Sequence, residues 1–197
     1  MKFLTMIRIR TKLLIIVVFM VLGIVGVGLT GYFYNNKAAA SLDEVYAGNM
    51  VAIEVLGDLR TNSRANFANM LNLMVTEDAD QKADVLANYE KRVAKIDTDL
   101  DSFIDTGLDE SENEQVAEMN TNLDAWDAVC AQIMSLVDEG NTADAIVLFK
   151  GSGEEVFETL QTTIRNLETY QKEEGEKIYS ESQANNKQGI LLIIVIA

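Results

Sequence analysis

An uninterrupted apolar segment near the N-terminus limits what this chain can fold into more than any other feature. No charged residue occurs from Leu13 to Asn36, and within residues 13–34 only Thr30 and two tyrosines carry polar groups. A helix rises about 1.5 Å per residue, so a segment of this length crosses the roughly 30 Å hydrocarbon core of a bilayer. The sequence therefore predicts a first transmembrane helix at residues 13–34.

The charges beside this segment predict its orientation. Residues 1–12 contain no acid and four bases, Lys2, Arg8, Arg10 and Lys12, whereas the first acid is Asp43. Basic flanks stay in the cytoplasm, so we expect a cytoplasmic N-terminus and an extracytoplasmic region after the span. A cleaved signal peptide is the alternative, with KAAAS at 37–41 as its cleavage site. The apolar segment is longer than the roughly 7–15 residues of a signal peptide, which favours the span.

Composition excludes several classes of function. The net charge of −15 argues against a nucleic-acid partner, because a phosphate backbone selects basic surfaces. The chain has no histidine and one cysteine, so it lacks the usual general base and the commonest metal ligands. Asp97, Asp99 and Asp101 lack the glycine and the final glutamate of a calcium loop, and we expect them on a solvated helix face. No catalytic residue, cofactor or metal site is predicted, and we expect no enzymatic activity.

Residues 36–188 show the apolar spacing of helices, and the chain contains no proline to break them. The pattern predicts one helix from the span to about Val75, a second from an N-cap at Thr76 to about Asp105, a third over about 111–139, a short piece at 142–149, and a fourth from about Glu154 onward. Four amphipathic helices with short connections favour an all-α, antiparallel up-down-up-down bundle over residues 36–188.

The fourth helix is expected to continue into the apolar C-terminal residues. Ile190 to Ala197 are all apolar. We interpret residues 189–197 as the start of a second transmembrane helix that is truncated in this chain. The long first and fourth helices would then both be continuous with transmembrane segments, in a multi-pass protein of the bacterial inner membrane.

Four segments carry a resemblance to a known family: IRTKLL (9–14), SLDEVYAGNMVAIEVLGDLRTNSRANF (41–67), EDADQKADVLANYEKRVAKIDTDL (77–100) and DEGNTADAIVLFKGSGEEVFETL (138–160). The chain resembles the N-terminal half of a methyl-accepting chemotaxis protein, with its four-helix-bundle sensor domain. The resemblance implies a homodimer that binds a small molecule outside the cell, such as an amino acid or an organic acid. It also implies a helix displacement through the second span to a cytoplasmic domain, absent here, that acts with a coupling protein on a histidine kinase.

RTNSRAN at 60–66 interrupts the apolar stripe of the first bundle helix. A guanidinium directed into a helix interface needs an anion, and a ligand carboxylate is one such anion. Counting the same depth along the fourth helix reaches threonine and asparagine. The candidate ligand-binding residues are Arg60, Ser63, Arg64, Thr162, Thr163 and Asn166.

The resemblance gives Arg64 partial support, because aspartate-type receptors have arginines on this helix face and Arg64 fits the first. The next two matching positions are Asn69 and Leu73, which puts aspartate itself in doubt. Alternatively, Arg60 and Arg64 pair with acids on a neighbouring helix or on the second subunit. Trp126 and Cys130 are predicted to be buried in the core.

Two other functions stay open from the sequence. The chain has the layout of the input half of another signalling protein, a sensor kinase or a cyclic-dinucleotide cyclase. It also has the layout of a membrane-tethered bundle that binds a partner protein without sensing a ligand.

Overall fold

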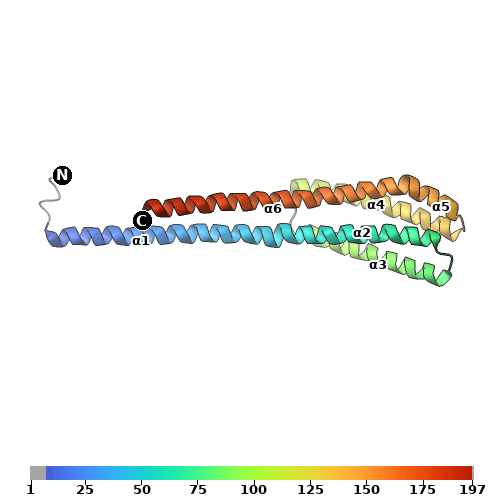
Figure 1. Cartoon of the computed structure of the whole chain (residues 1–197), viewed down its shortest axis with the longest axis horizontal. Helices are drawn as coiled ribbons and strands as arrows, with labels where there is room; N and C mark the ends of the chain where they lie inside the picture. Colours follow the sequence, from blue (N-terminus) through green and yellow to red (C-terminus); the bar gives the residue numbers. More distant parts are fainter. Residues whose placement is uncertain (1–7, 197) are drawn as a thin grey trace. The chain divides into compact units, whose positions relative to one another are not determined.

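The computed structural model describes residues 8–196, and all regular structure in that range is helical (Figure 1). Residues 1–7 of the predicted basic N-terminus, and Ala197, lie outside the described residues. The elements are α1 (Ile9–Asp43), η2 (Glu44–Met50), α2 (Val51–Val75), α3 (Ala79–Ile104), α4 (Glu110–Asp138), α5 (Thr142–Leu148), η3 (Phe149–Gly153) and α6 (Glu154–Ile196). The two η elements are π-helical, a form that occurs mostly as single-turn bulges and often at functional sites.

The chain divides into two compact units. One is the bundle, residues 46–175, which contains α2, α3, α4, α5 and the first half of α6. The other combines α1 with the C-terminal part of α6. The predicted all-α four-helix bundle is confirmed.

The bundle core is built from the apolar faces that the sequence indicates. On α4 the apolar residues at helical spacing are all buried: Val116, Met119, Leu123, Trp126, Cys130, Ile133 and Val137. On α3 and α6 the buried apolar residues are Tyr89, Ile96, Leu100, Phe103, Phe157, Leu160, Ile164 and Leu167. Burying a large apolar side chain contributes about 1.5–3 kcal/mol, so this contiguous core is the main source of the bundle's stability.

The helix ends follow from local hydrogen bonding. Asp78, not Thr76, caps α3, because its carboxylate accepts from the backbone N–H of Gln81 at 2.9 Å. The predicted N-cap at Thr76 is therefore wrong: Thr76 closes α2, with its N–H and its hydroxyl both donating to Asn72 O. Asp109 caps α4 in a capping box with Glu112.

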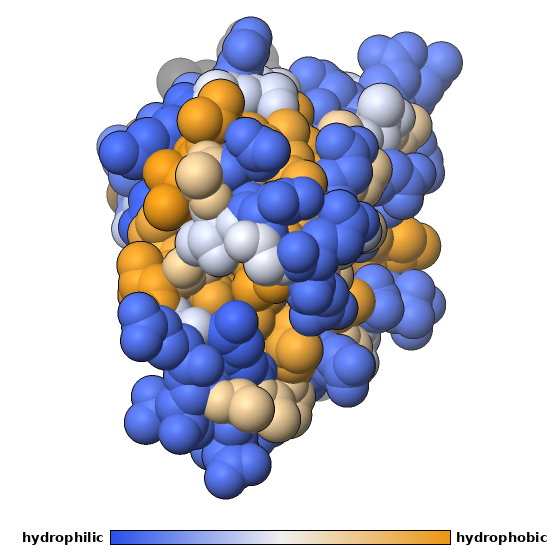
Figure 2. Space-filling view, turned by 90° about the vertical axis from the view of Figure 1, so that its right-hand side faces the viewer, coloured by the Kyte–Doolittle hydropathy of each residue, from blue (hydrophilic) through white to orange (hydrophobic). Residues whose placement is uncertain are grey.

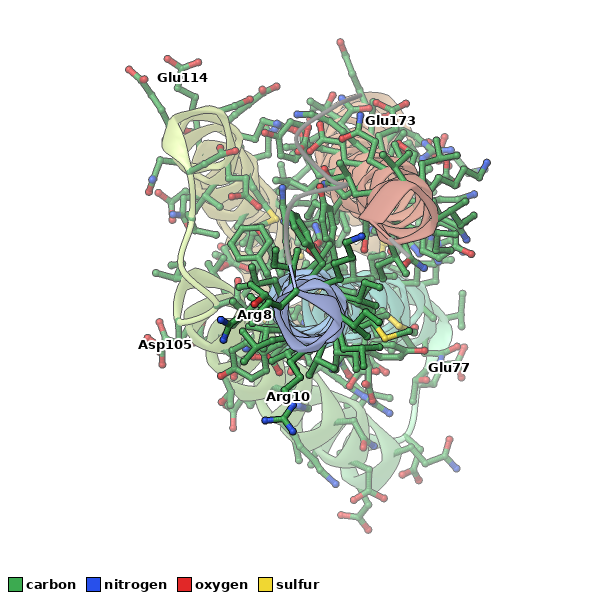
Figure 3. All side chains as sticks on the ribbon, turned by 90° about the vertical axis from the view of Figure 1, so that its left-hand side faces the viewer. Arg8, Arg10, Glu77, Asp105, Glu114 and Glu173 are labelled. Atoms are coloured by element: carbon green, nitrogen blue, oxygen red, sulfur yellow. The ribbon has the colours of Figure 1, made fainter. Side chains whose placement is uncertain are left out.

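In the unit formed by α1 and the end of α6, α1 is mostly apolar and has no buried residue. Within the described residues, the helix Ile9–Val75 holds a segment that is long and apolar enough to cross a membrane, and none of that segment is buried. Arg8 and Arg10 lie at the start of α1 and point in different directions (Figure 3). This arrangement supports a membrane anchor near the N-terminus.

The bundle surface is strongly acidic. Glu77, Asp105, Glu114 and Glu173 are exposed and project outward (Figure 3). Figure 2 views the bundle end that carries the α2–α3 turn and α5, where hydrophilic residues surround smaller apolar areas. Val75 and Val147 are exposed apolar residues near this end.

Candidate functional site

The predicted arginines lie on the side of α2 that faces α6. Arg60 Nη1 is 2.7 Å from Glu168 Oε2, in a half-buried ion pair. This is the pairing with an acid on a neighbouring helix that was the alternative to a ligand role. Arg60 therefore has a protein anion already in place.

Arg64 has a neutral partner. Its Nε–H donates to Gln161 Oε1 at 3.0 Å, and among the described residues no acidic side chain forms an ion pair with it. Gln161 is 2% exposed, and its Nε2 has no hydrogen-bond acceptor in the described structure. A buried amide N–H without an acceptor costs about 1–3 kcal/mol. Between α2 and α6, the exposed Arg64 guanidinium therefore has no counter-ion among the described residues. The amide nitrogen of Gln161 beside it has no hydrogen-bond acceptor there.

The other four candidates are divided between the interior and the surface. Ser63 is buried and donates to Leu59 O of its own helix at 2.7 Å. Thr163 is buried and accepts from Asn122 Nδ2 of α4 at 2.9 Å.

Thr162 and Asn166 are exposed on α6. The Thr162 hydroxyl donates to Glu158 O at 2.8 Å and accepts from Arg165. The six candidates therefore do not converge on one cavity.

Sequence reasoning missed the α6 residues that contact the arginines. Glu168 and Gln161 flank the predicted positions 162–166 by one or two residues. An antiparallel count by helical rise reached the adjacent residues of α6 and did not select Gln161 or Glu168.

An aromatic cluster forms the core beside these residues. The ring of Phe67 stacks on Trp126 and Phe157, with centroids 5.9 Å and 4.4 Å away, and lies 4.7 Å from Phe149. Trp126 is 1% exposed, so its predicted core role is confirmed. Its Nε1 and Asn66 Oδ1 are buried without hydrogen-bond partners in the described structure.

A second polar region lies between α2 and α3. An open groove of about 520 Å³ is lined by Asp58, Thr61, Asn62, Lys91, Arg92, Ala94, Lys95 and Thr98. Asp99 lies beneath it and is 3% exposed, so the prediction of a solvated acidic face is wrong at this residue. Its carboxylate accepts from Lys95 Nζ at 2.5 Å and from Asn62 Nδ2 at 3.2 Å, which compensates its burial.

The comparison with protein families gives a match over residues 6–186 to the four-helix bundle sensory module for signal transduction. The chain belongs to this family. The match covers the bundle and most of the helices on either side of it, and it confirms the predicted kinship with the N-terminal sensor of methyl-accepting chemotaxis proteins. A comparison with curated proteins found no match.

The sensory module also contains two buried ionisable residues, Tyr89 and Cys130. Tyr89 donates from its hydroxyl to Asp127 Oδ1 at 3.3 Å, and burial raises its pKa. Burial also raises the pKa of Cys130 to about 12, so the thiol stays protonated at neutral pH. The predicted burial of Cys130 is confirmed, and its environment favours a structural role over a reactive one.

A polar network closes the bundle near the η2 end. Asn49 of η2 donates to Gln171 of α6, and Gln171 Nε2 donates to Glu112 of α4. Tyr170 donates to Asp109 Oδ2 at 2.5 Å, and this bond raises the pKa of Tyr170 to about 12. The sensory module thus ties three chain segments together through two adjacent residues of α6.

Proposed function

We propose that this chain is the sensory half of a transmembrane chemoreceptor. It binds a small molecule outside the cell, and the fourth bundle helix carries a displacement inward. The family match supplies the sensory role in signal transduction. The proposed location is the bacterial inner membrane, with the N-terminus in the cytoplasm.

The observation that carries the ligand role is the unequal pairing of the two arginines. Arg60 has Glu168 as its counter-ion, whereas Arg64 is exposed and contacts only the neutral Gln161 among the described residues. A carboxylate docking on Arg64 would gain a charge-assisted, bidentate contact without displacing a protein anion. We therefore place the proposed ligand contact at Arg64, with an amino acid or an organic acid as ligand.

The route for the signal is α6. Gln161 and Glu168, which contact the arginines, belong to the same helix as the apolar residues 190–195. A ligand that draws Arg64 away from Gln161 changes the contacts of α2 with α6. In the proposed mechanism the shift passes along α6 to a cytoplasmic domain that acts, with a coupling protein, on a histidine kinase, and the receptor works as a homodimer.

Calorimetry tests ligand binding. The whole chain, in lipid nanodiscs, is titrated with amino acids and small organic acids, and compared with Arg64→Ala. Arg165→Ala is a matched control, because it removes an exposed arginine of α6. We expect at least a tenfold loss of affinity in Arg64→Ala and none in the control. If no tested compound binds Arg64→Ala more weakly than the other two proteins, Arg64 is not part of the site.

Fusion to different output domains tests the signalling role. The chain is joined to the cytoplasmic part of a chemoreceptor, and kinase activity is measured with and without the ligand found by calorimetry. A ligand-dependent change supports the chemoreceptor. If the chain responds only when it is joined to a sensor kinase or a cyclase, it is the input domain of a protein of that class. If ligand binds but no fusion responds, the chain is a membrane-tethered bundle that binds a partner protein.

A further inference from the structure

The groove between α2 and α3 concentrates positive charge on an acidic protein. The chain carries 16 basic and 31 acidic residues, yet Lys91, Arg92 and Lys95 all line this groove. Lys95 is neutralised by the buried Asp99. Lys91 and Arg92 then face one acid in the lining, Asp58, which leaves an excess of positive charge.

Arg92 is held in place by the groove floor. Its Nη1 donates to Asn62 Oδ1 at 2.7 Å, and Asn62 is 5% exposed. Asn62 is fixed in turn, because its Nδ2 donates to Asp58 O at 2.9 Å and to Asp99 Oδ2 at 3.2 Å. A guanidinium has five N–H donors, so most remain available to a ligand in the groove. Holding the arginine in advance reduces the conformational entropy that binding would cost.

The opposite wall supplies acceptors. Thr61 of α2 donates its own hydroxyl hydrogen to Gly57 O, so its oxygen is left as an acceptor toward the groove. Asp58 adds a carboxylate on the same helix. A ligand that contacts both α3 and α2 would therefore carry an anionic group that binds Arg92 and Lys91. It would also carry a hydroxyl group that donates to Asp58 or Thr61. The groove volume of about 520 Å³ lies within the roughly 300–1,000 Å³ of small-molecule sites.

We propose that the α2–α3 groove is a binding site for a small hydroxycarboxylate, with Arg92 and Lys91 holding the carboxylate. It lies on a different side of α2 from Arg64, which faces α6. Asn62 links the site to the inside of the bundle, since it connects Arg92 at the surface to the buried Asp99. The inference concerns binding alone and does not depend on the proposed signalling role.

Calorimetry of the whole chain in nanodiscs tests the proposal with lactate and with propionate, which has the same skeleton without the hydroxyl. One hydrogen bond contributes about 0.5–1.5 kcal/mol, so we expect lactate to bind about three- to tenfold more tightly. Hydrogen exchange measured in parallel should show slower exchange at residues 57–62 and 91–98 when lactate is present.

Two variants and two controls locate the site. Arg92→Gln keeps a side-chain donor for Asn62 but removes the guanidinium, and Lys91→Gln removes an exposed charge without disturbing the core. Each should weaken lactate binding at least tenfold, whereas Lys82→Gln on the same helix, and Arg64→Ala, should leave it unchanged. Absence of lactate binding, equal losses in Lys82→Gln, or a loss only in Arg64→Ala would each overturn the proposal.

Discussion

Asn49 and Gln171 are joined by two hydrogen bonds across 122 residues of sequence. The Nδ2 of Asn49 donates to Gln171 Oε1 at 2.9 Å and to Gln171 O at 3.2 Å. Asn49 belongs to the π-helical segment η2, and Gln171 also donates to the buried Glu112. The pair therefore fixes the register of α6 against the start of α2 and the cap of α4.

Removing Gln171 should destabilise the bundle more than removing Asn49. Gln171→Ala leaves the 8%-exposed Glu112 without its side-chain donor, and a buried acceptor left unpaired costs about 1–3 kcal/mol. Asn49→Ala breaks the bonds to Gln171 but leaves the bond between Gln171 and Glu112 in place, so we expect a smaller loss of about 1 kcal/mol. Thermal unfolding of the whole chain measures both.

Asn88→Ala is the control for this network, since Asn88 is exposed and its side chain donates to Asp84 O within its own helix. It should change the stability little. If Gln171→Ala unfolds at the same temperature as this control, the network does not stabilise the bundle.

Substitution by alanine should change the stability of the bundle in opposite directions at two glycines. Gly57 lies inside α2 with open space around the position of a Cβ, so Gly57→Ala should stabilise by about 1 kcal/mol through helix propensity. Gly140 has a φ of 78° at the end of α4, where its N–H donates to Val137 O. Gly140→Ala should cost about 1–2 kcal/mol, because a Cβ strains this left-handed conformation.

Unfolding midpoints in denaturant distinguish the two glycine effects. The midpoint should rise for Gly57→Ala and fall for Gly140→Ala, with equal denaturant slopes. A fall for both would mean that the open space at Gly57 is occupied in the assembled protein, for example by a second subunit.

The helices were predictable because burial imposes a helical spacing on apolar residues, and the buried residues of α4 show this spacing from Val116 to Val137. The N-cap of α3 was not predictable, because threonine and aspartate are both common N-cap residues. Only the hydrogen bond from Gln81 N–H shows that Asp78, and not Thr76, caps the helix. Periodicity locates the turn but does not choose between two capping residues.

The partners of charged residues were less predictable than the helices. Burial of Asp99 depends on Asn62 of α2, and contact of Arg64 with Gln161 depends on the α2–α6 register. Tertiary register, which the spacing of one helix does not contain, sets these contacts.

Cys130 should react slowly with thiol reagents in the folded chain. Burial raises its pKa from 9.0 to about 12, which lowers the thiolate fraction at neutral pH about a thousandfold, and the side chain is 0% exposed. We expect modification by a disulfide reagent only at the rate at which the bundle opens. The rate in native buffer, compared with that in denaturant, measures this, and fast native labelling would contradict a closed core.

The pH dependence of stability follows from the same shift. A raised folded pKa means that the folded state holds the Cys130 proton more tightly than the unfolded state. The stability from this group is complete below about pH 9 and is lost as the pH rises toward 12. Cys130→Ala removes this dependence, so the difference in unfolding free energy between wild type and variant should shrink over that range.

Tyr34 and Gly189 pack together in the unit formed by α1 and the end of α6. A Cβ on Gly189 would lie 2.6 Å from Cγ of the Tyr34 ring and 2.8 Å from Cδ2, closer than carbon atoms approach. Gly189→Ala should therefore push the two helices apart and lower the unfolding temperature of the chain in nanodiscs. Gly28→Ala is the control in the same unit, because no atom of the described residues beyond its own helix turn lies within 4 Å of its added methyl group.

A second substitution shows whether the clash is the cause. Tyr34→Ala removes the ring, so the double variant Tyr34→Ala, Gly189→Ala should recover stability relative to Gly189→Ala alone. Residues in contact typically show coupling energies of about 0.5–3 kcal/mol in such a cycle, whereas independent sites add. If the two losses are additive, or if Gly189→Ala unfolds like Gly28→Ala, then Tyr34 does not rest on Gly189 in the membrane.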